Sequence, residues 1–183
     1  MNFIKKEPKI FIVSGKARSG KGEISKLISE YYSKKKSIII SFGHYIKEYA
    51  KNVSNWDGSE DTKPRELLQN LGIELIKNKI DNKLFIRRIL EDIEVYSYFY
   101  DVIIINDARL LDEITSIKNK YNNSISIRIK RNGFNNKLTL SEQQHITEID
   151  LDNYNNFDYV IENDNYENLK NRLYKILEEV EHG

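Results

Sequence analysis

A glycine-rich segment between an apolar run and a helical pattern constrains this chain more than any other feature. Residues 15–22 read G-K-A-R-S-G-K-G and directly follow the apolar residues 10–13. Glycines let the backbone curl so that successive N–H groups point inward, and Lys21 adds a mobile positive charge. The helix that follows aims the positive end of its dipole at the same place. The segment therefore predicts a phosphate-binding loop within a strand–loop–helix unit.

The loop departs from the usual G-x-x-x-x-G-K-[ST] pattern at one position. Gly22 stands where a serine or threonine hydroxyl commonly touches Mg²⁺, so the motif by itself is only moderately specific. Its context supports the prediction, because apolar residues follow at helical spacing, namely Ile24, Leu27, Ile28 and Tyr31. The alternative is a glycine-bearing turn whose lysine is merely solvated.

Further segments read as strands with helical patterns between them. The expected strands cover residues 37–42, 101–106, 124–129 and 157–161. Their apolar runs suit a parallel sheet that is buried on both faces. Helical spacing recurs within residues 67–76, 110–121 and 169–180. This alternation predicts a doubly wound α/β domain with a five-stranded parallel sheet, helices on both faces, and ligands beyond the carboxyl ends of the strands.

Composition limits the class of protein. The 183 residues suit a single domain, expected over residues 1–183, and the net charge of +1 gives no reason to expect nucleic acid or a membrane as partner. Cysteine is absent, which excludes disulfides, thiolate metal sites and a cysteine nucleophile. Because no membrane-length apolar stretch or signal-peptide core is visible, we expect a cytoplasmic protein. The oligomeric state stays open, and a homodimer is compatible with the sequence.

Two stretches interrupt the rhythm of strands and helices. Residues 43–99 form a long, mainly helical insertion between two strands, and residues 132–144 are polar and contain a glycine. Compact domains seldom keep such segments without a use. We therefore expect the insertion to bind an acceptor substrate and residues 131–148 to form a lid. An ordinary helical layer and a surface loop are the alternatives.

Asp107 and Arg109 directly follow the strand at residues 101–106, where an open α/β sheet presents its ligand site. A carboxylate at this place can hold Mg²⁺ directly or through water, or accept a hydrogen bond from substrate. A guanidinium two residues later can bind a phosphate through two parallel hydrogen bonds. The alternative interpretation makes Asp107 a helix cap and Arg109 a surface residue.

The insertion carries a second group of polar side chains. Lys47 lies on its first helix, and Lys63, Arg65 and Gln69 begin its second. Together they could bind the phosphate and base of an acceptor, although each one alone reads as a solvated helix residue. Trp56, the only tryptophan, either packs the insertion against the core or lines the acceptor pocket.

The expected lid begins at Arg131, where a guanidinium could neutralise charge on a transferring phosphoryl group. Arg128 and Lys130 precede it on the polar face of a strand. His145 and Glu148 invite a catalytic interpretation, but phosphoryl transfer between two phosphates needs no histidine nucleophile. We therefore interpret Glu148 as a structural residue that holds lid residues or accepts hydrogen bonds from backbone N–H groups.

Taken in order, these motifs resemble the phage-type deoxynucleoside monophosphate kinase family. The similar segments read S-G-K-A-R-S-G-K from residue 14, F-G-H-Y-I-K-E-Y-A from residue 42, K-P-R-E-L-L-Q-N-L-G from residue 63, N-D-A-R from residue 106 with Glu113, and H-I-T-E from residue 145 with L-D at 151–152. Each segment alone is a weak signal. Their order and spacing over nearly the whole chain are fairly specific.

The resemblance implies a P-loop kinase fold, ATP and Mg²⁺ as cofactors, and a role for each matching residue. The implied ATP-binding residues are Gly15, Lys16, Ala17, Arg18, Ser19, Gly20, Lys21, Gly22 and Glu23. The implied acceptor-binding residues are Lys47, Arg65, Gln69, Asp107 and Arg109. Lys21, Arg109 and Arg131 are the expected catalytic residues, and Asp107 is the expected contact of the metal.

We accordingly expect transfer of a phosphoryl group from ATP to a nucleoside or deoxynucleoside monophosphate, without a covalent intermediate. Two departures from the family bear on this expectation. Gly22 stands where the family commonly has aspartate, and only Lys77 or Lys79 is available where related sequences tend to carry arginine. The alternatives are a phosphomevalonate kinase of the animal type and a nucleotide-binding regulatory module without catalysis. The sequence does not identify the base or the sugar.

Overall fold

A five-stranded parallel sheet forms the centre of the molecule, as the apolar runs predict. The computed structural model describes residues 3–133 and 138–182. The strands are β1 (Lys9–Gly15), β2 (Ser37–Ile40), β3 (Val102–Ala108), β4 (Ile125–Lys130) and β5 (Tyr159–Glu162). Their order across the sheet is β2-β3-β1-β4-β5, and all four neighbouring pairs are parallel. β2 is shorter than expected because Ser41 is already the N-cap position of the helix that begins at Phe42.

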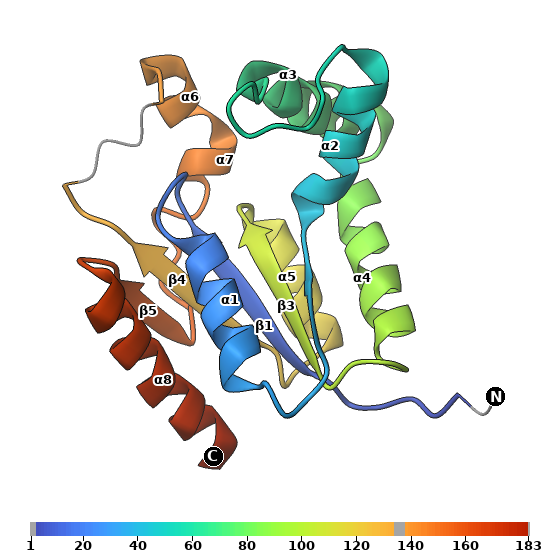
Figure 1. Ribbon diagram of the computed structural model, residues 1–183. Helices are drawn as coiled ribbons and strands as arrows, with labels where there is room; N and C mark the ends of the chain where they lie inside the picture. The colour runs from blue at the N-terminus through green and yellow to red at the C-terminus, as the bar shows by residue number, and fades with distance from the viewer. Residues whose placement is uncertain (1–2, 134–137, 183) are drawn as a thin grey trace.

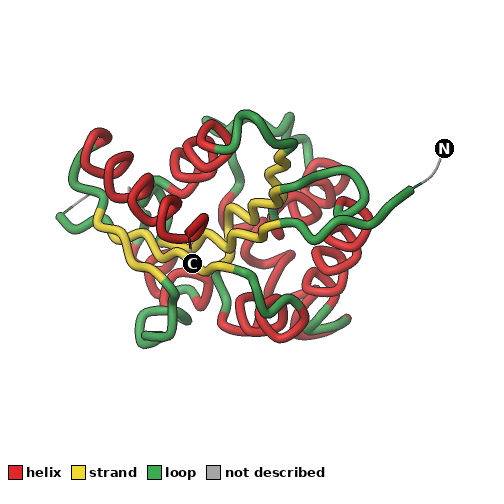
Figure 2. Tube along the Cα trace, turned by 90° about the horizontal axis from the view of Figure 1, so that it is seen from below, coloured by secondary structure: helices red, strands yellow, loops and turns green. Residues whose placement is uncertain are grey.

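Helices cover both faces of the sheet, and further helices stand above its carboxyl edge (Figures 1 and 2). The helices are α1 (Lys21–Tyr31), α2 (Phe42–Val53), α3 (Arg65–Gln69), the π-helix η1 (Asn70–Ile80), α4 (Leu84–Tyr96), α5 (Leu111–Lys120), α6 (Leu140–Gln144), α7 (Ile146–Ile149) and α8 (Tyr166–His182). α1 and α8 pack on one face, and α4 and α5 pack on the other. This arrangement confirms the predicted doubly wound α/β architecture.

The alternating side chains of β3 show why both faces need a cover. Val102 and Ile104 belong to the apolar cluster beneath α1 and α8, whereas Ile103 and Ile105 belong to the cluster beneath α4 and α5. All four side chains are fully buried. A strand buried on both sides reads as a continuous apolar run, which is the pattern that the sequence carries.

The helical insertion divides into two parts with different packing. Its last helix, α4, buries Ile86, Ile89 and Ile93 against the sheet and so belongs to the ordinary helical layer. Its first helices, α2, α3 and η1, stand above the carboxyl edge of the strands, opposite α6 and α7 (Figure 1). Residues 134–137 of the expected lid lie outside the described residues. Among the helices that the structure describes, none has the length and apolar character needed to cross a membrane.

Candidate active site

The glycine-rich segment forms a tight loop between β1 and α1. Gly20 has a left-handed backbone with φ of 109°, and a Cβ atom there would lie 2.5 Å from Asn163 Nδ2. Both conformation and space therefore require glycine at this position. The side-chain amide of Asn163 donates to the carbonyl oxygen of Ser19 at 2.7 Å, which ties the loop to the segment after β5.

Lys21 lies folded back onto the loop that precedes it. Its Nζ donates to the carbonyl oxygens of Gly15 at 2.7 Å and of Lys16 at 2.8 Å. Burial, with a smaller contribution from the nearby Arg109 guanidinium, lowers the pKa of Lys21 to about 7, although Glu148 opposes the shift. An anion bound in this loop would stabilise the charged ammonium form of the side chain.

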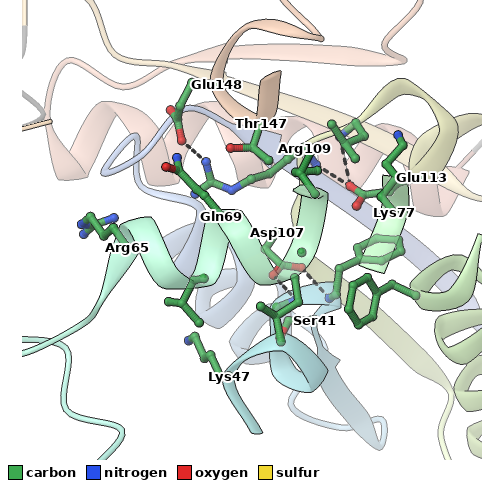
Figure 3. Close-up of a pocket in the computed structure, with 18 of the residues that line it drawn as sticks. Ser41, Lys47, Arg65, Gln69, Lys77, Asp107, Arg109, Glu113, Thr147 and Glu148 are labelled. Atoms are coloured by element: carbon green, nitrogen blue, oxygen red, sulfur yellow. Dashed lines mark hydrogen bonds and ion pairs between the residues drawn. The ribbon is translucent and has the colours of Figure 1, made fainter. Parts of the chain in front are cut away.

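A cavity of about 380 Å³ opens beside the loop. Its walls come from α2, α3, η1 and the start of α4, from the end of β3, and from α7 (Figure 3). The predicted residues that line it are Lys21, Gly22, Lys47, Arg65, Gln69, Asp107 and Arg109. The structure thus brings the end of the phosphate-binding loop and the whole predicted acceptor set into one space.

Asp107 uses both carboxylate oxygens to fix the start of α2. It accepts hydrogen bonds from the backbone N–H groups of Phe42 and Gly43, both at 2.8 Å. A negative charge at the positive end of a helix is stabilising, so this contact anchors the insertion to the sheet. A Cβ at Gly43 would lie only 2.8 Å from the carboxylate, which explains glycine there. Asp107 is therefore a helix cap that also faces the cavity.

Arg109 is held between two glutamates at the edge of the cavity. Its guanidinium pairs with Glu148, and its backbone N–H donates to Glu113 Oε2 at 2.7 Å. Glu113 also accepts from the Leu110 N–H group at 3.0 Å, so it caps the first turn of α5. Burial raises the pKa of the Glu113 carboxyl to about 7. Figure 3 shows both contacts of Arg109 as dashed lines.

The insertion presents cations to the other side of the cavity. Lys47 and Lys63 both pair with Glu60, at 3.5 Å and 3.0 Å, and desolvation by burial is the main cause that lowers the pKa of Lys63. Arg65 and Lys47 lie on the opposite side of the view from Glu113 and Lys77 in Figure 3. Anionic groups entering the cavity would therefore meet positive charge from both ends.

Comparison with known proteins decides the family. A family model described as deoxynucleotide monophosphate kinase matches residues 38–173, which is more than half of the chain. The chain belongs to this family. The kinase therefore uses ATP to phosphorylate a deoxynucleoside monophosphate, as the ordered motifs predict. The match favours this function over a phosphomevalonate acceptor and over an inactive module. The matched region begins after the phosphate-binding loop. The loop is therefore identified by its own sequence and by the fold, independently of the family match.

Solved structures support the fold of the kinase. A shikimate kinase from Aquifex aeolicus has 13% identity and a TM-score of 0.54, with 95% of this chain and 99% of that chain covered. An APS kinase from Mycobacterium tuberculosis, in complex with AMPPNP and APS, has 10% identity and a TM-score of 0.58, with 96% and 99% covered. At such identities the likeness shows the P-loop kinase fold alone. A search of curated proteins gave no match.

Arg131 and Trp56 lie away from the cavity, as do the predicted ATP-binding residues other than Lys21 and Gly22. Arg131 donates to the carbonyl oxygen of Arg18 at 3.4 Å and lines a second cavity, of about 450 Å³, together with Lys16, Ala17 and Ser19. The structure therefore does not bring Arg131 to the side of the loop where Arg109 lies. Trp56 is buried, and its indole N–H donates to the Ser59 carbonyl oxygen at 2.9 Å. Of the two roles left open for it, the structure supports packing of the insertion.

Sequence reasoning missed other residues of the kinase site. Phe42 and Phe85 supply aromatic surface to the cavity, and Glu113 adds a carboxylate. Lys77, one of the two lysines considered in place of an arginine, also lines the cavity. Glu113 belongs to one of the motifs quoted above, but no role was predicted for it. Phe42 also opens a quoted motif, but neither phenylalanine indicated a role, because an apolar residue at a helix start reads as core.

Proposed function

We propose that the kinase binds the phosphates of ATP in the loop at Lys21 and the deoxynucleoside monophosphate in the 380 Å³ cavity. One observation carries this division: Lys21, Gly22 and Arg109 line the same cavity, and the Arg109 guanidinium lies near enough to Lys21 to lower its pKa. A donor phosphate held by the loop would therefore face an acceptor phosphate held by Arg109. The shared opening also gives the two substrates a route to each other without solvent between them.

In the proposed mechanism the chain supplies position and charge rather than covalent chemistry. An oxygen of the acceptor phosphate attacks the γ-phosphorus of ATP, and the bond to the β-γ bridging oxygen breaks, which leaves ADP and a diphosphate. Lys21 and Arg109 stabilise the negative charge that spreads over the transferring oxygens. Thr147 and Glu148 line the cavity from α7, so this segment helps to exclude water.

Mg²⁺ fits this site as a partner of the phosphates rather than of a protein cage. Among the described residues no group of three or more histidine, aspartate or glutamate side chains could hold a metal ion. Asp107 is one of the carboxylates that line the cavity together with Lys21, and it already accepts two backbone hydrogen bonds. We propose that Asp107 holds Mg²⁺ through water. When bound, the ion neutralises charge on the phosphate oxygens, and it usually keeps several of its own waters.

The acceptor base has aromatic and amide groups available to it. Phe42, Phe85, Gln69 and Asn82 line the cavity. Aromatic rings provide stacking surface, and the two amides provide both donors and acceptors. Lys47, Arg65 and Lys77 add positive charge, which we assign to binding of the acceptor phosphate. The catalytic role predicted for Arg131 is kept as a proposal for the donor side of the loop.

An assay with an acceptor panel tests the proposal directly. ADP release would be measured with ATP, Mg²⁺ and each common deoxynucleoside and ribonucleoside monophosphate, with phosphomevalonate as comparison. We expect release only with nucleotides, and the strongest with deoxynucleotides. Arg109→Ala should reduce kcat/KM for the acceptor by an amount equivalent to about 1.5–3 kcal/mol, through loss of a charged hydrogen bond. An effect on ATP affinity alone would contradict the placement of Arg109.

A further inference from the structure

Glu148 connects the two halves of the proposed site through one carboxylate. Its Oε2 atom accepts a hydrogen bond from the backbone N–H of Ala17, in the phosphate-binding loop, at 2.9 Å. Its Oε1 atom pairs with the guanidinium of Arg109. The side chain is only 5% exposed. Both oxygens are thus committed, one to the donor loop and one to the acceptor arginine.

Burial restricts the Glu148 carboxylate to an arrangement in which both of its oxygens have partners. A buried carboxylate is costly unless it is paired and hydrogen-bonded, so Glu148 favours the one arrangement that satisfies both oxygens. A guanidinium has five N–H donors in a rigid fork, and one pair to a carboxylate occupies only part of them. Glu148 therefore restrains the Arg109 guanidinium through one nitrogen while leaving its other donors for a phosphate.

The segment that carries Glu148 is itself held in place. The His145 side chain accepts a hydrogen bond from the Thr147 N–H group at the start of α7. Asp150, at the other end of α7, accepts from the backbone N–H of Leu111 at 2.7 Å. α7 is thus attached to the body of the molecule by two carboxylates. Only the one at residue 148 touches residues of the proposed site.

We propose that Glu148 is a positioning residue of the phosphoryl transfer. It orients Arg109 toward the acceptor phosphate and holds it at a fixed place relative to the donor loop. The inference rests on the proposed function, because it needs Arg109 to bind the acceptor. It extends the structural interpretation of Glu148, since the side chain acts on the reaction through another residue. Loss of the Glu148 carboxylate should therefore raise KM for the acceptor without a matching fall in the Tm of the kinase.

The test compares two matched substitutions on the same short segment. Glu148→Gln and Asp150→Asn each replace a carboxylate by an amide of the same shape, so each can keep its hydrogen bond to a backbone N–H group. Glu148→Gln should raise KM for the deoxynucleoside monophosphate by about 10- to 100-fold, with KM for ATP changed less than about threefold. Asp150→Asn should leave both constants within about twofold. Equal losses of activity in the two variants, in step with equal falls in Tm, would show a merely structural role and overturn the proposal.

A double-mutant cycle with Arg109→Ala separates the inference from the proposed function. If Glu148 acts through Arg109, Glu148→Gln should add less than about threefold to the effect of Arg109→Ala, because neighbouring groups in one network are not additive. Full additivity would overturn the inference. If Arg109→Ala alone leaves acceptor KM unchanged, the proposed function fails at that residue. If Arg109→Ala raises KM while Glu148→Gln does not, only the inference fails.

Discussion

Lys21 offers a quantitative test of the donor site through proton linkage. Burial lowers its pKa to about 7 in the kinase without nucleotide. Phosphate oxygens in the loop would return the pKa toward the ordinary value of roughly 10.4, because an adjacent anion favours the charged form. At a pH between these two pKa values, the Lys21 side chain is neutral in the kinase without nucleotide and protonated when nucleotide is bound. The contribution of Lys21 to nucleotide affinity should therefore be constant well below pH 7 and fall as the pH rises above it.

The size of the effect follows from the two pKa values. At pH 8 the free lysine is about nine-tenths neutral, so binding should take up about 0.9 proton. Kd should rise about fivefold from pH 7 to pH 8 and about ninefold more from pH 8 to pH 9. Isothermal titration calorimetry with a non-hydrolysable ATP analogue would measure both quantities, in two buffers of different ionisation enthalpy. At pH 7 and above the phosphates are about nine-tenths or more ionised, since their last pKa is about 6.

Two variants decide which group titrates. Lys21→Met should bind the analogue weakly at every pH and show neither proton uptake nor a slope. Glu113 needs its own control, because burial raises its pKa to about 7 and its ionisation would also oppose an anion. The slope should survive in Glu113→Gln. A constant Kd in the wild-type kinase, or a slope that persists in Lys21→Met, would refute the assignment of Lys21 to the phosphates.

Three further predictions test single features of the site. Gly20→Ala forces a side chain into a left-handed backbone 2.5 Å from Asn163 Nδ2, so it should lower the free energy of unfolding by at least about 1–2 kcal/mol in a denaturant titration. Gly22→Ser should be tolerated, because a Cβ atom at this position would have no atom within 4 Å. The new hydroxyl should lower the Mg²⁺ concentration needed for half-maximal ADP release. An unchanged Mg²⁺ requirement would contradict the role given to the missing hydroxyl. Lys77→Ala should raise acceptor KM about tenfold in steady-state kinetics, whereas Lys79→Ala, at an exposed position, should leave it within about twofold; equal effects would exclude a specific role for Lys77.

The fold could be predicted from sequence because each of its elements carries a local signal. Apolar runs such as residues 102–105 leave little choice other than a strand covered on both faces. The loop at residues 15–22 adds the order of strand, loop and helix. Asp107 and Arg109 could be placed near the loop because parallel strands bring their carboxyl ends to one edge of the sheet. All of these inferences need only periodicity and topology.

The side-chain contacts of the site could not be predicted in the same way. Glu148 meets Ala17 and Arg109 from 131 and 39 positions away along the chain, and no local pattern encodes which N–H group it will accept from. The cap that Asp107 gives to α2 likewise spans 64 and 65 positions. Such pairs depend on how α7 and the insertion pack above the sheet edge, which is a property of the whole packed structure.

The winding of η1 is a further feature that the sequence did not predict, and it determines which lysine faces the cavity. In an α-helix a step of four residues advances about 40° past a full turn, so Arg65, Gln69, Ile73 and Lys77 would drift by about 120° around the axis. From Asn70 onward the helix is π-wound, with the Asp81 N–H group donating to the Ile76 carbonyl oxygen five residues back. More residues per turn cancel the drift, and all four of these side chains line the cavity. The choice between Lys77 and Lys79 thus depends on a backbone geometry that apolar periodicity, counted at 3.6 residues per turn, does not detect.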